Sequence, residues 1–337
     1  MTIRVGINGF GRIGRLALRT AWQQTGELEF VHINDLSSEP TCAAHLLMHD
    51  SIHGRWNRTV ESTAASLIVD GRTIGYSMAP TPADAAWHTR GVDLVLECSG
   101  QFKTLDALQP YLDQGIKKLV VSAPSADPAI LNVVMGVNDH QYDPDRHTVV
   151  TAASCTTNCL APVVKVIQEH LGIRRASLTT IHSINNTQGV VDQYRPDWRR
   201  ARAAGLSMIP TSTSAAQAIV HIFPALTGRI DGLAVRVPSL NASLTDMVFE
   251  VARPTSVAEV NACLQMAAEG DLRGILGYEP APLVSIDYRN DPRSAVIDAL
   301  STKVIDGTHV KVLAWYDNET GYASRLVELL SKVARAL

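Results

Sequence analysis

A glycine-rich turn near the N-terminus constrains the fold of this chain more than any other feature. Residues 3–8 form an apolar run that predicts a strand, and residues 12–22 have apolar positions at helical spacing. Three glycines stand between them in the spacing G-x-G-x-x-G: Gly9, Gly11 and Gly14. In a strand–turn–helix unit these permit a tight turn, close approach of a pyrophosphate and close packing of helix on strand.

A second apolar run, residues 28–34, ends in Asp35, at the distance where an acidic residue contacts the ribose of a bound dinucleotide. A carboxylate there accepts hydrogen bonds from ribose hydroxyls and repels a 2′-phosphate, which favours NAD over NADP. The alternative is a glycine turn in an ordinary βαβ unit. The predicted cofactor-binding residues are Gly9, Phe10, Gly11, Arg12, Ile13, Gly14 and Asp35.

Further apolar runs with helical segments between them, such as residues 104–115, predict a doubly wound parallel sheet of the Rossmann type. Residues 66–71 suit a short hairpin element. Ligands bind at the carboxyl ends of such strands, so Gly100 and Ser122 are cofactor-side candidates, although ordinary turn residues explain them equally well. The further strand candidates are 92–100, 117–125 and 147–155.

Length and composition limit the classes of function. The chain has 337 residues, enough for two domains, with 46% hydrophobic and 19% charged residues and a net charge of −3. Without a basic cluster, nucleic acid is not an expected partner. We expect no membrane span and no signal peptide, and the five cysteines are too few and too odd in number for a disulfide framework. These features favour the cytoplasm.

The stretch "ASCTTNCLAP" follows the last predicted strand and begins a helical pattern that Gly172 ends. Cys155 therefore stands at a helix N-terminus, where the helix dipole and nearby amides favour the thiolate. We predict that Cys155 is a nucleophile and that Cys159, one turn deeper, is buried. Two cysteines at this spacing are too few for a structural zinc site, so no metal is expected.

A thiol nucleophile requires a base, and His182 in "LTTIHSINNTQ" is the best placed of the 11 histidines. It follows a β-branched strand candidate and begins a polar loop. A capping or core histidine is the alternative, because separation along the chain does not show whether Cys155 and His182 meet.

Seven segments in order along the chain resemble the phosphorylating glyceraldehyde-3-phosphate dehydrogenase family: "INGFGRIGR", "ASCTTNCLAPV", "TTIHS", "DWRRARAA", "IPTSTSAA", "AVRVP" and "WYDNETGYASR". Erythrose-4-phosphate dehydrogenase shares most of them. The resemblance implies that Cys155 attacks an aldehyde and that His182 takes the proton. A hydride then passes to NAD, and inorganic phosphate cleaves the resulting thioester.

The resemblance also implies roles for other residues. Arg236 would bind the phosphate of the substrate, and Asn318, with Tyr322 close by, would contact the nicotinamide carboxamide. The residues expected around the substrate phosphate and the attacking phosphate are Ser154, Thr156, Asn185, Arg200, Thr213, Ser214 and Arg236.

The architecture implied by the resemblance has two domains. Residues 1–151 would bind NAD, and residues 152–317 would form an α+β catalytic domain with a mainly antiparallel sheet. The helical pattern of residues 318–337 would pack back on the first domain. The resemblance further implies a homotetramer that acts on a small phosphorylated aldehyde and inorganic phosphate.

Five residues at four places depart from the family's usual pattern. Asn185 stands in place of a threonine, Ser214 in place of a glycine, Thr320 in place of a tryptophan, and Gln193-Tyr194 in place of a small apolar pair. Asparagine and serine still donate hydrogen bonds, so these changes tune the pockets without removing a charge. Erythrose 4-phosphate as substrate, and a role linked to arsenate detoxification, therefore stay open beside glyceraldehyde 3-phosphate.

Overall fold

The structure is a computed structural model that describes residues 2–23 and 26–337. Contacts divide these residues into two compact units. The first contains the described residues up to Met135, together with Asp139–Ser154 and Ala323–Leu337. The second contains Gly136–Asn138 and Cys155–Tyr322. Each unit has its own sheet.

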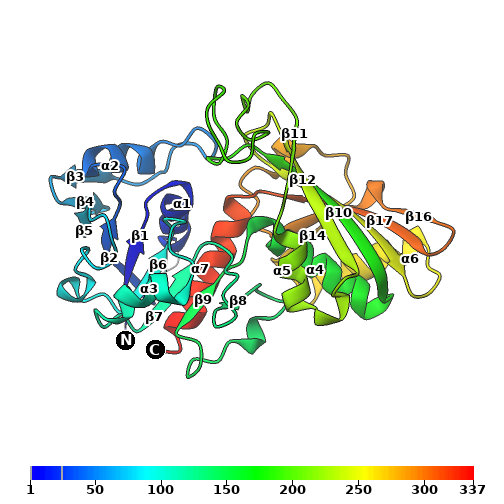
Figure 1. Ribbon diagram of the computed structural model, residues 1–337, viewed down its shortest axis with the longest axis horizontal. Helices are drawn as coiled ribbons and strands as arrows, with labels where there is room; N and C mark the ends of the chain where they lie inside the picture. Colours follow the sequence, from blue (N-terminus) through cyan, green and yellow to red (C-terminus); the bar gives the residue numbers. More distant parts are fainter. Residues whose placement is uncertain (1, 24–25) are drawn as a thin grey trace. The chain divides into compact units, whose positions relative to one another are not determined.

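Within the described part of the first unit, nine strands form one sheet in the order β3-β4-β5-β2-β1-β6-β7-β9-β8 (Figure 1). The strands from β5 to β8 pair in parallel, which confirms the predicted Rossmann-type sheet. At the other edge β3, β4 and β5 form an antiparallel meander, of which the predicted hairpin element is β4. The strands are β1 Ile3–Asn8, β2 Leu28–Asn34, β3 Val60–Thr63, β4 Ser66–Val69, β5 Arg72–Ser77, β6 Leu94–Glu97, β7 Lys118–Val121, β8 Leu131–Asn132 and β9 Val149–Thr151.

The helices of this unit are α1 Arg12–Ala21, α2 Pro40–Met48, α3 Leu105–Leu112 and most of α7 Thr320–Ala334, with 3-10 turns at Trp87–Arg90 and Asp139–Gln141. The side chain of Thr104 caps α3 by accepting from the N–H of Ala107. Trp87 and Tyr111 are fully buried in the core that α3 covers. Near the chain's end, Lys332 Nζ lies 2.6 Å from a carboxylate oxygen of Asp139, which holds α7 in this unit.

Among the residues described in the second unit, eight strands form a mixed, mainly antiparallel sheet. Its main path runs β11-β12-β10-β13-β17-β15-β14, and β16 pairs with β17. Only β10 with β12 and β14 with β15 run parallel, so the expected antiparallel character is confirmed. The strands are β10 Ile173–Ser183, β11 Ile209–Thr211, β12 Ile230–Val237, β13 Ser243–Val251, β14 Leu276–Glu279, β15 Ala295–Asp298, β16 Lys303–Ile305 and β17 His309–Tyr316.

Three helices pack on this sheet: α4 Cys155–His170, α5 Ala215–Ile222 and α6 Val257–Glu269 (Figure 1). Apart from the exposed His309 at the start of β17, residues of β13 and β17 alternate between buried and half-buried, as expected for strands with one face against helices. Helix α4 ends before Gly172, whose φ of +69° ends the helix as the sequence predicts. The 3-10 turns are Pro224–Leu226, Ser285–Tyr288 and Ala299–Ser301.

None of the helices in the described residues combines the length and the apolar character that crossing a membrane requires.

Candidate active site

The predicted glycine turn connects β1 to α1, and its geometry explains the residue types. Gly9 has a φ of +89°, and a Cβ there would lie 2.4 Å from the backbone nitrogen of Ser99. A Cβ on Gly14 would lie 2.3 Å from the carbonyl oxygen of Gly9, so the helix can pack this closely on the turn only with glycine at position 14. A Cβ on Gly11 would meet nothing within 4 Å. The open space beside the first amides of α1 fits a pyrophosphate.

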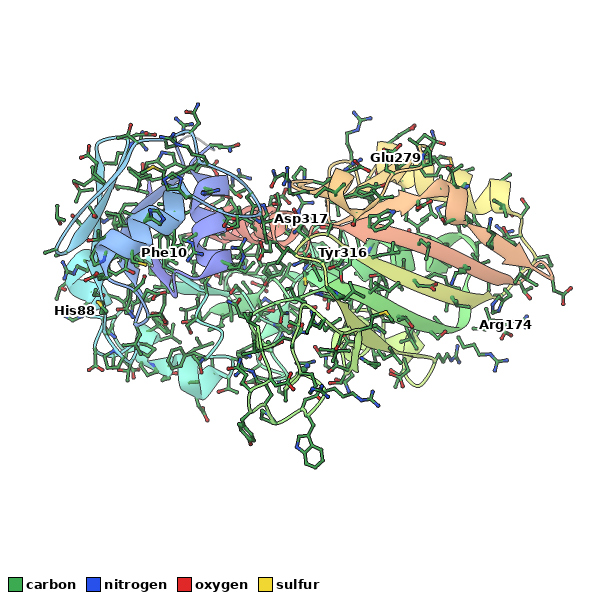
Figure 2. The ribbon with its side chains drawn as sticks, turned by 90° about the horizontal axis from the view of Figure 1, so that it is seen from above. Phe10, His88, Arg174, Glu279, Tyr316 and Asp317 are labelled. Carbon is green, nitrogen blue, oxygen red and sulfur yellow. The ribbon has the colours of Figure 1, made fainter. Side chains whose placement is uncertain are left out.

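Asp35 follows β2 and closes this turn. Its carboxylate accepts hydrogen bonds from the backbone N–H groups of Phe10 and, at 2.7 Å, Ser37. Phe10, labelled in Figure 2, has a buried side chain, and its contact with Asp35 is made by its backbone N–H. Arg12 forms a 3.1 Å ion pair with Asp50, which anchors the first turn of α1.

The other predicted cofactor residues of this unit lie nearby in the fold. Ile13 is half-buried in the first turn of α1. Ser122 directly follows β7, and its backbone N–H donates to the carbonyl of Glu97 at 2.8 Å. Gly100 has a φ of +72°, which supports the interpretation of this residue as a turn glycine.

Cys155 begins α4 directly after a tight turn at the end of β9. In that turn Ala153 has a φ of +53°, a conformation that costs a residue with a Cβ about 1–2 kcal/mol. The hydroxyl of Thr151 offsets part of this cost by accepting from the Ala153 N–H at 2.9 Å. Ser154 is half-buried in the turn. The tight turn makes Cys155 the first residue of the helix, as the sequence predicts.

Two neighbouring strands bring a histidine and an arginine to Cys155. Cys155 Sγ lies 3.6 Å from His182 Nε2, so the predicted pair is within hydrogen-bonding distance. His182 on β10 is paired in register with Arg236 on β12. One guanidinium nitrogen of Arg236 contacts His182 Nδ1 and donates to the carbonyl of Ser183 at 3.2 Å. The three side chains therefore form one continuous group.

Burial shifts the pKa values of His182 and Cys155 in opposite directions. Burial and the charge of Arg236 lower the pKa of His182 to about 3, so the ring is neutral near pH 7. Burial raises the pKa of the Cys155 thiol, and Arg236 and hydrogen bonds of Thr156 oppose this rise. The positive group beside the thiol is thus the guanidinium of Arg236.

Tyr316, labelled in Figure 2, lies at the end of β17 and extends this group. It was not predicted from the sequence as a site residue. Its hydroxyl lies 2.8 Å from the hydroxyl of Thr180 and 3.1 Å from that of Thr156. Its ring meets the ring of His182 edge to face, with centroids 6.1 Å apart. Alternation along β17, which places Ala314 and Tyr316 on the buried face, was the sequence signal that could have found it.

Arg200 comes from the long loop before β11 and lies beside this group. Its Nε donates to Thr211 Oγ1 at 2.8 Å, and Asp197 pairs with it at 3.5 Å. The charge of Arg200 lowers the pKa of both His182 and Arg236. Two arginines that act on one histidine form a region suited to anions.

The remaining predicted anion-site residues differ in how far the structure ties them to this group. Thr213 accepts from the N–H of Ala215 at 3.2 Å and so stands at the start of α5, beside the exposed Ser214. Asn185 is exposed, and its side-chain oxygen accepts from the N–H and hydroxyl of Thr187 at 3.0 and 2.6 Å. No hydrogen bond in the described residues joins Asn185 to Arg236.

Asn318 and Tyr322 lie in the segment that follows β17. Asn318 is buried, and its side-chain oxygen accepts from the hydroxyls of Ser183 and Ser243 at 2.7 and 3.1 Å. Tyr322 is 5% exposed in the first turns of α7.

Cys159 is fully buried, as predicted, and lies 3.7 Å from the hydroxyl of Thr245. Burial raises the pKa of its thiol to about 12. In the described residues, no cluster of three or more histidine, cysteine or acidic side chains has the arrangement of a metal site.

Comparison with known proteins agrees with this geometry. Residues 3–105 match the model of the glyceraldehyde 3-phosphate dehydrogenase NAD-binding domain, and residues 154–318 match that of the C-terminal domain. The chain is 59% identical to glyceraldehyde-3-phosphate dehydrogenase 3 of Nostoc sp., over the full length of both. It is 48% identical to glyceraldehyde-3-phosphate dehydrogenase of Geobacillus stearothermophilus, over 99% of each chain.

A plasmid-encoded glyceraldehyde-3-phosphate dehydrogenase of Cupriavidus necator is 47% identical over the full length of both chains. Both domains of the family are therefore present, with the cysteine and histidine of its motifs within hydrogen-bonding distance of each other. The chain belongs to the glyceraldehyde-3-phosphate dehydrogenase family and carries its NAD-binding domain.

Proposed function

We propose that this chain oxidises D-glyceraldehyde 3-phosphate with NAD and inorganic phosphate to 1,3-bisphosphoglycerate. The observation that carries this proposal is the 3.6 Å approach of Cys155 Sγ to His182 Nε2, with a guanidinium nitrogen of Arg236 against the other ring nitrogen, Nδ1. The three side chains in contact are those that we propose as nucleophile, proton acceptor and phosphate-binding cation.

In the proposed reaction Cys155 Sγ forms a bond to the aldehyde carbon. The thiol proton passes by way of His182 to the aldehyde oxygen, which becomes the hydroxyl of a thiohemiacetal. His182 accepts that hydroxyl proton as the carbon is oxidised to a thioester. When bound, NAD supplies the acceptor for the hydride that leaves this carbon. Inorganic phosphate then attacks the thioester carbon, the carbon–sulfur bond breaks, and Cys155 leaves as a thiolate with an acyl phosphate as product.

The charge of Arg236 links the substrate phosphate to the strength of the base. In the free protein Arg236 is the main electrostatic cause, after burial, of the low pKa of His182. A phosphate dianion held by Arg236 offsets that charge, so the pKa of His182 rises toward the range that a base requires. Phosphorylated aldehydes are therefore preferred over unphosphorylated ones in catalytic rate as well as in affinity.

The same proposal assigns the anion-binding and cofactor-binding residues and the domains. Residues 1–151 with helix 318–337 would bind NAD, and residues 152–317 would carry the chemistry. The residues proposed for the two phosphates are Ser154, Thr156, Asn185, Arg200, Thr213, Ser214 and Arg236. Those proposed for NAD are Gly9, Phe10, Gly11, Arg12, Ile13, Gly14, Asp35, Ser122, Asn318 and Tyr322. A cytoplasmic homotetramer is part of this proposal through family membership.

The test is NADH formation from glyceraldehyde 3-phosphate and from erythrose 4-phosphate at saturating NAD and phosphate, compared as kcat/KM. Because one carbon of length is worth about 1–3 kcal/mol in a pocket, we expect turnover of both aldehydes and a preference for glyceraldehyde 3-phosphate. A tenfold preference for erythrose 4-phosphate would overturn the substrate assignment. Replacing phosphate with arsenate in the same assay measures whether the acceptor site takes the larger anion.

A further inference from the structure

Asn318 is held by two serines from two different strands of the second sheet. Ser183 ends β10 and Ser243 begins β13, and both are fully buried. Ser183 Oγ lies 2.7 Å and Ser243 Oγ 3.1 Å from the side-chain oxygen of Asn318. The two serines are also joined directly, because the N–H of Ser183 donates to Ser243 Oγ at 3.1 Å.

We propose that Ser183 and Ser243 are positioning residues that fix the orientation of the Asn318 amide, so that its amino group faces the ligand. This inference rests on the proposed function, in which Asn318 contacts the nicotinamide carboxamide. It adds that the contact is a donation to the carbonyl oxygen of the carboxamide and not an acceptance from its amino group.

Counting hydrogens supports this orientation of the amide. With the Asn318 oxygen toward the serines, Ser183 and Ser243 each donate their single hydroxyl hydrogen to it, and its two lone pairs are filled. Ser243 Oγ still accepts from the Ser183 N–H. Every hydrogen of the three groups that lies in this network then has an acceptor.

The reversed amide leaves the network incomplete. Ser243 Oγ would accept from both the Asn318 amino group and the Ser183 N–H, which fills its two lone pairs. The hydroxyl hydrogen of Ser183 would then have no acceptor, because the part of the chain described here offers Ser183 Oγ no partner besides Ser243 and Asn318. Leaving a buried hydroxyl without an acceptor is destabilising, so the first orientation of the amide is favoured.

The turn that carries Asn318 is itself fixed. Asp317 is 1% exposed, and its carboxylate accepts from the backbone N–H groups of Asn290, Glu319 and Thr320, each at 2.8 Å (Figure 2). The backbone position of Asn318 therefore does not depend on the serines. The serines instead fix the torsion angle of the amide about its last side-chain bond. Without such partners that angle has a broad, two-fold distribution.

The amino group of Asn318 is left as a donor. Among the described residues, none accepts a hydrogen bond from Asn318 Nδ2. A buried amide whose oxygen is saturated and whose amino group has no protein acceptor is suited to a ligand that presents a carbonyl oxygen. The carboxamide of nicotinamide presents one.

The first test compares dissociation constants of NAD and of its 3-acetylpyridine analogue, which keeps the carbonyl but has a methyl in place of the amino group. Both are measured by quenching of protein fluorescence for wild type and Asn318→Ala. Loss of a donor to the carbonyl weakens both ligands by the same factor, about 3- to 10-fold for one hydrogen bond. Weakening of NAD alone would show that Asn318 accepts from the amino group, and would overturn the inference, as would no weakening of either.

The second test asks whether Ser243 acts through Asn318. Ser243→Ala should weaken NAD binding about 2- to 5-fold in the wild-type background and less than about 1.5-fold in the Asn318→Ala background. Equal effects in both backgrounds would show a merely structural role and overturn the inference. If Ser243→Ala does not fold, Ser183→Ala, on the other strand, is compared in the same two backgrounds.

Thr245→Val is the matched control, because it removes a fully buried hydroxyl from the same strand that does not contact Asn318. It should leave the dissociation constant for NAD unchanged. These binding measurements do not depend on aldehyde oxidation. If the dissociation constants for NAD change as predicted but the protein does not oxidise glyceraldehyde 3-phosphate, the proposed function alone is contradicted. If the protein oxidises glyceraldehyde 3-phosphate but Ser243→Ala weakens NAD binding equally with and without Asn318, this inference alone is contradicted.

Discussion

The low pKa of His182 predicts a specific loss of stability in acid that the variant His182→Asn should escape. The folded protein keeps His182 neutral down to about pH 3, because the ring is buried beside Arg236. In the unfolded chain the ring takes a proton near its ordinary pKa of about 6.5. Between these values the unfolded state binds more protons, so the free energy of unfolding falls as the pH falls.

The size of this loss follows from the difference between the two pKa values. Each pH unit below about 6.5 costs the wild type up to about 1.4 kcal/mol at this site, so the loss is on the order of 2 kcal/mol at pH 5. The variant does not lose this stability, because asparagine does not titrate. Burial also lowers the pKa of His32 to about 4, but His32 is present in both proteins, so its contribution cancels in the difference between them. The loss is complete only below the folded pKa of about 3.

The assay is urea unfolding of wild type and His182→Asn at pH 7.5 and pH 5, at one protein concentration. The difference in unfolding free energy between the two proteins should move by about 2 kcal/mol in favour of the variant at pH 5. A difference that is the same at both pH values would refute the claim that His182 is buried neutral beside Arg236.

Three further predictions use the same geometry. Cys155→Ala should abolish aldehyde oxidation while NAD still binds. Cys159→Ala should keep most of the activity, because that thiol is buried and has a pKa of about 12. Steady-state rates and NAD titrations check both variants. Asp35→Ala should narrow the preference for NAD over NADP because it removes the carboxylate that repels a 2′-phosphate, and equal use of both cofactors by wild type would contradict this placement. Tyr316→Phe leaves the buried hydroxyls of Thr180 and Thr156 without their shared partner, and it should lower the free energy of unfolding by about 1–3 kcal/mol, measured with urea. The same variant should shift the pH dependence of Cys155 alkylation. An unchanged pH dependence would show that Tyr316 is not part of the site.

Local patterns in the sequence were sufficient for much of the first unit. The turn around Gly9 and Gly14 and the parallel strands could be predicted because each depends on residues close together in the chain. The helix that starts at Cys155 and ends before Gly172 was predictable for the same reason. The antiparallel β3–β5 edge was only partly predictable, since short strands carry a weak periodic signal.

The site itself depends on pairing between distant segments. His182 meets Arg236 because β10 and β12 pair in parallel register, a fact that no local pattern contains. The low pKa of His182 follows from its burial and from that pairing with Arg236, so no local pattern could have predicted it. The places of Tyr316 and Ser243 likewise depend on the order of strands in the sheet, and the motif that contains Tyr316 drew attention only to its neighbours Asn318 and Tyr322.

The most direct test of the central claim is a single-turnover experiment with glyceraldehyde 3-phosphate and NAD in the absence of inorganic phosphate. The proposed thioester predicts a burst of about one NADH per chain, an acyl group on Cys155 found by mass spectrometry of the trapped protein, and sustained turnover once phosphate is added. Sustained NADH formation without phosphate, or an acyl group on any residue other than Cys155, would contradict the account.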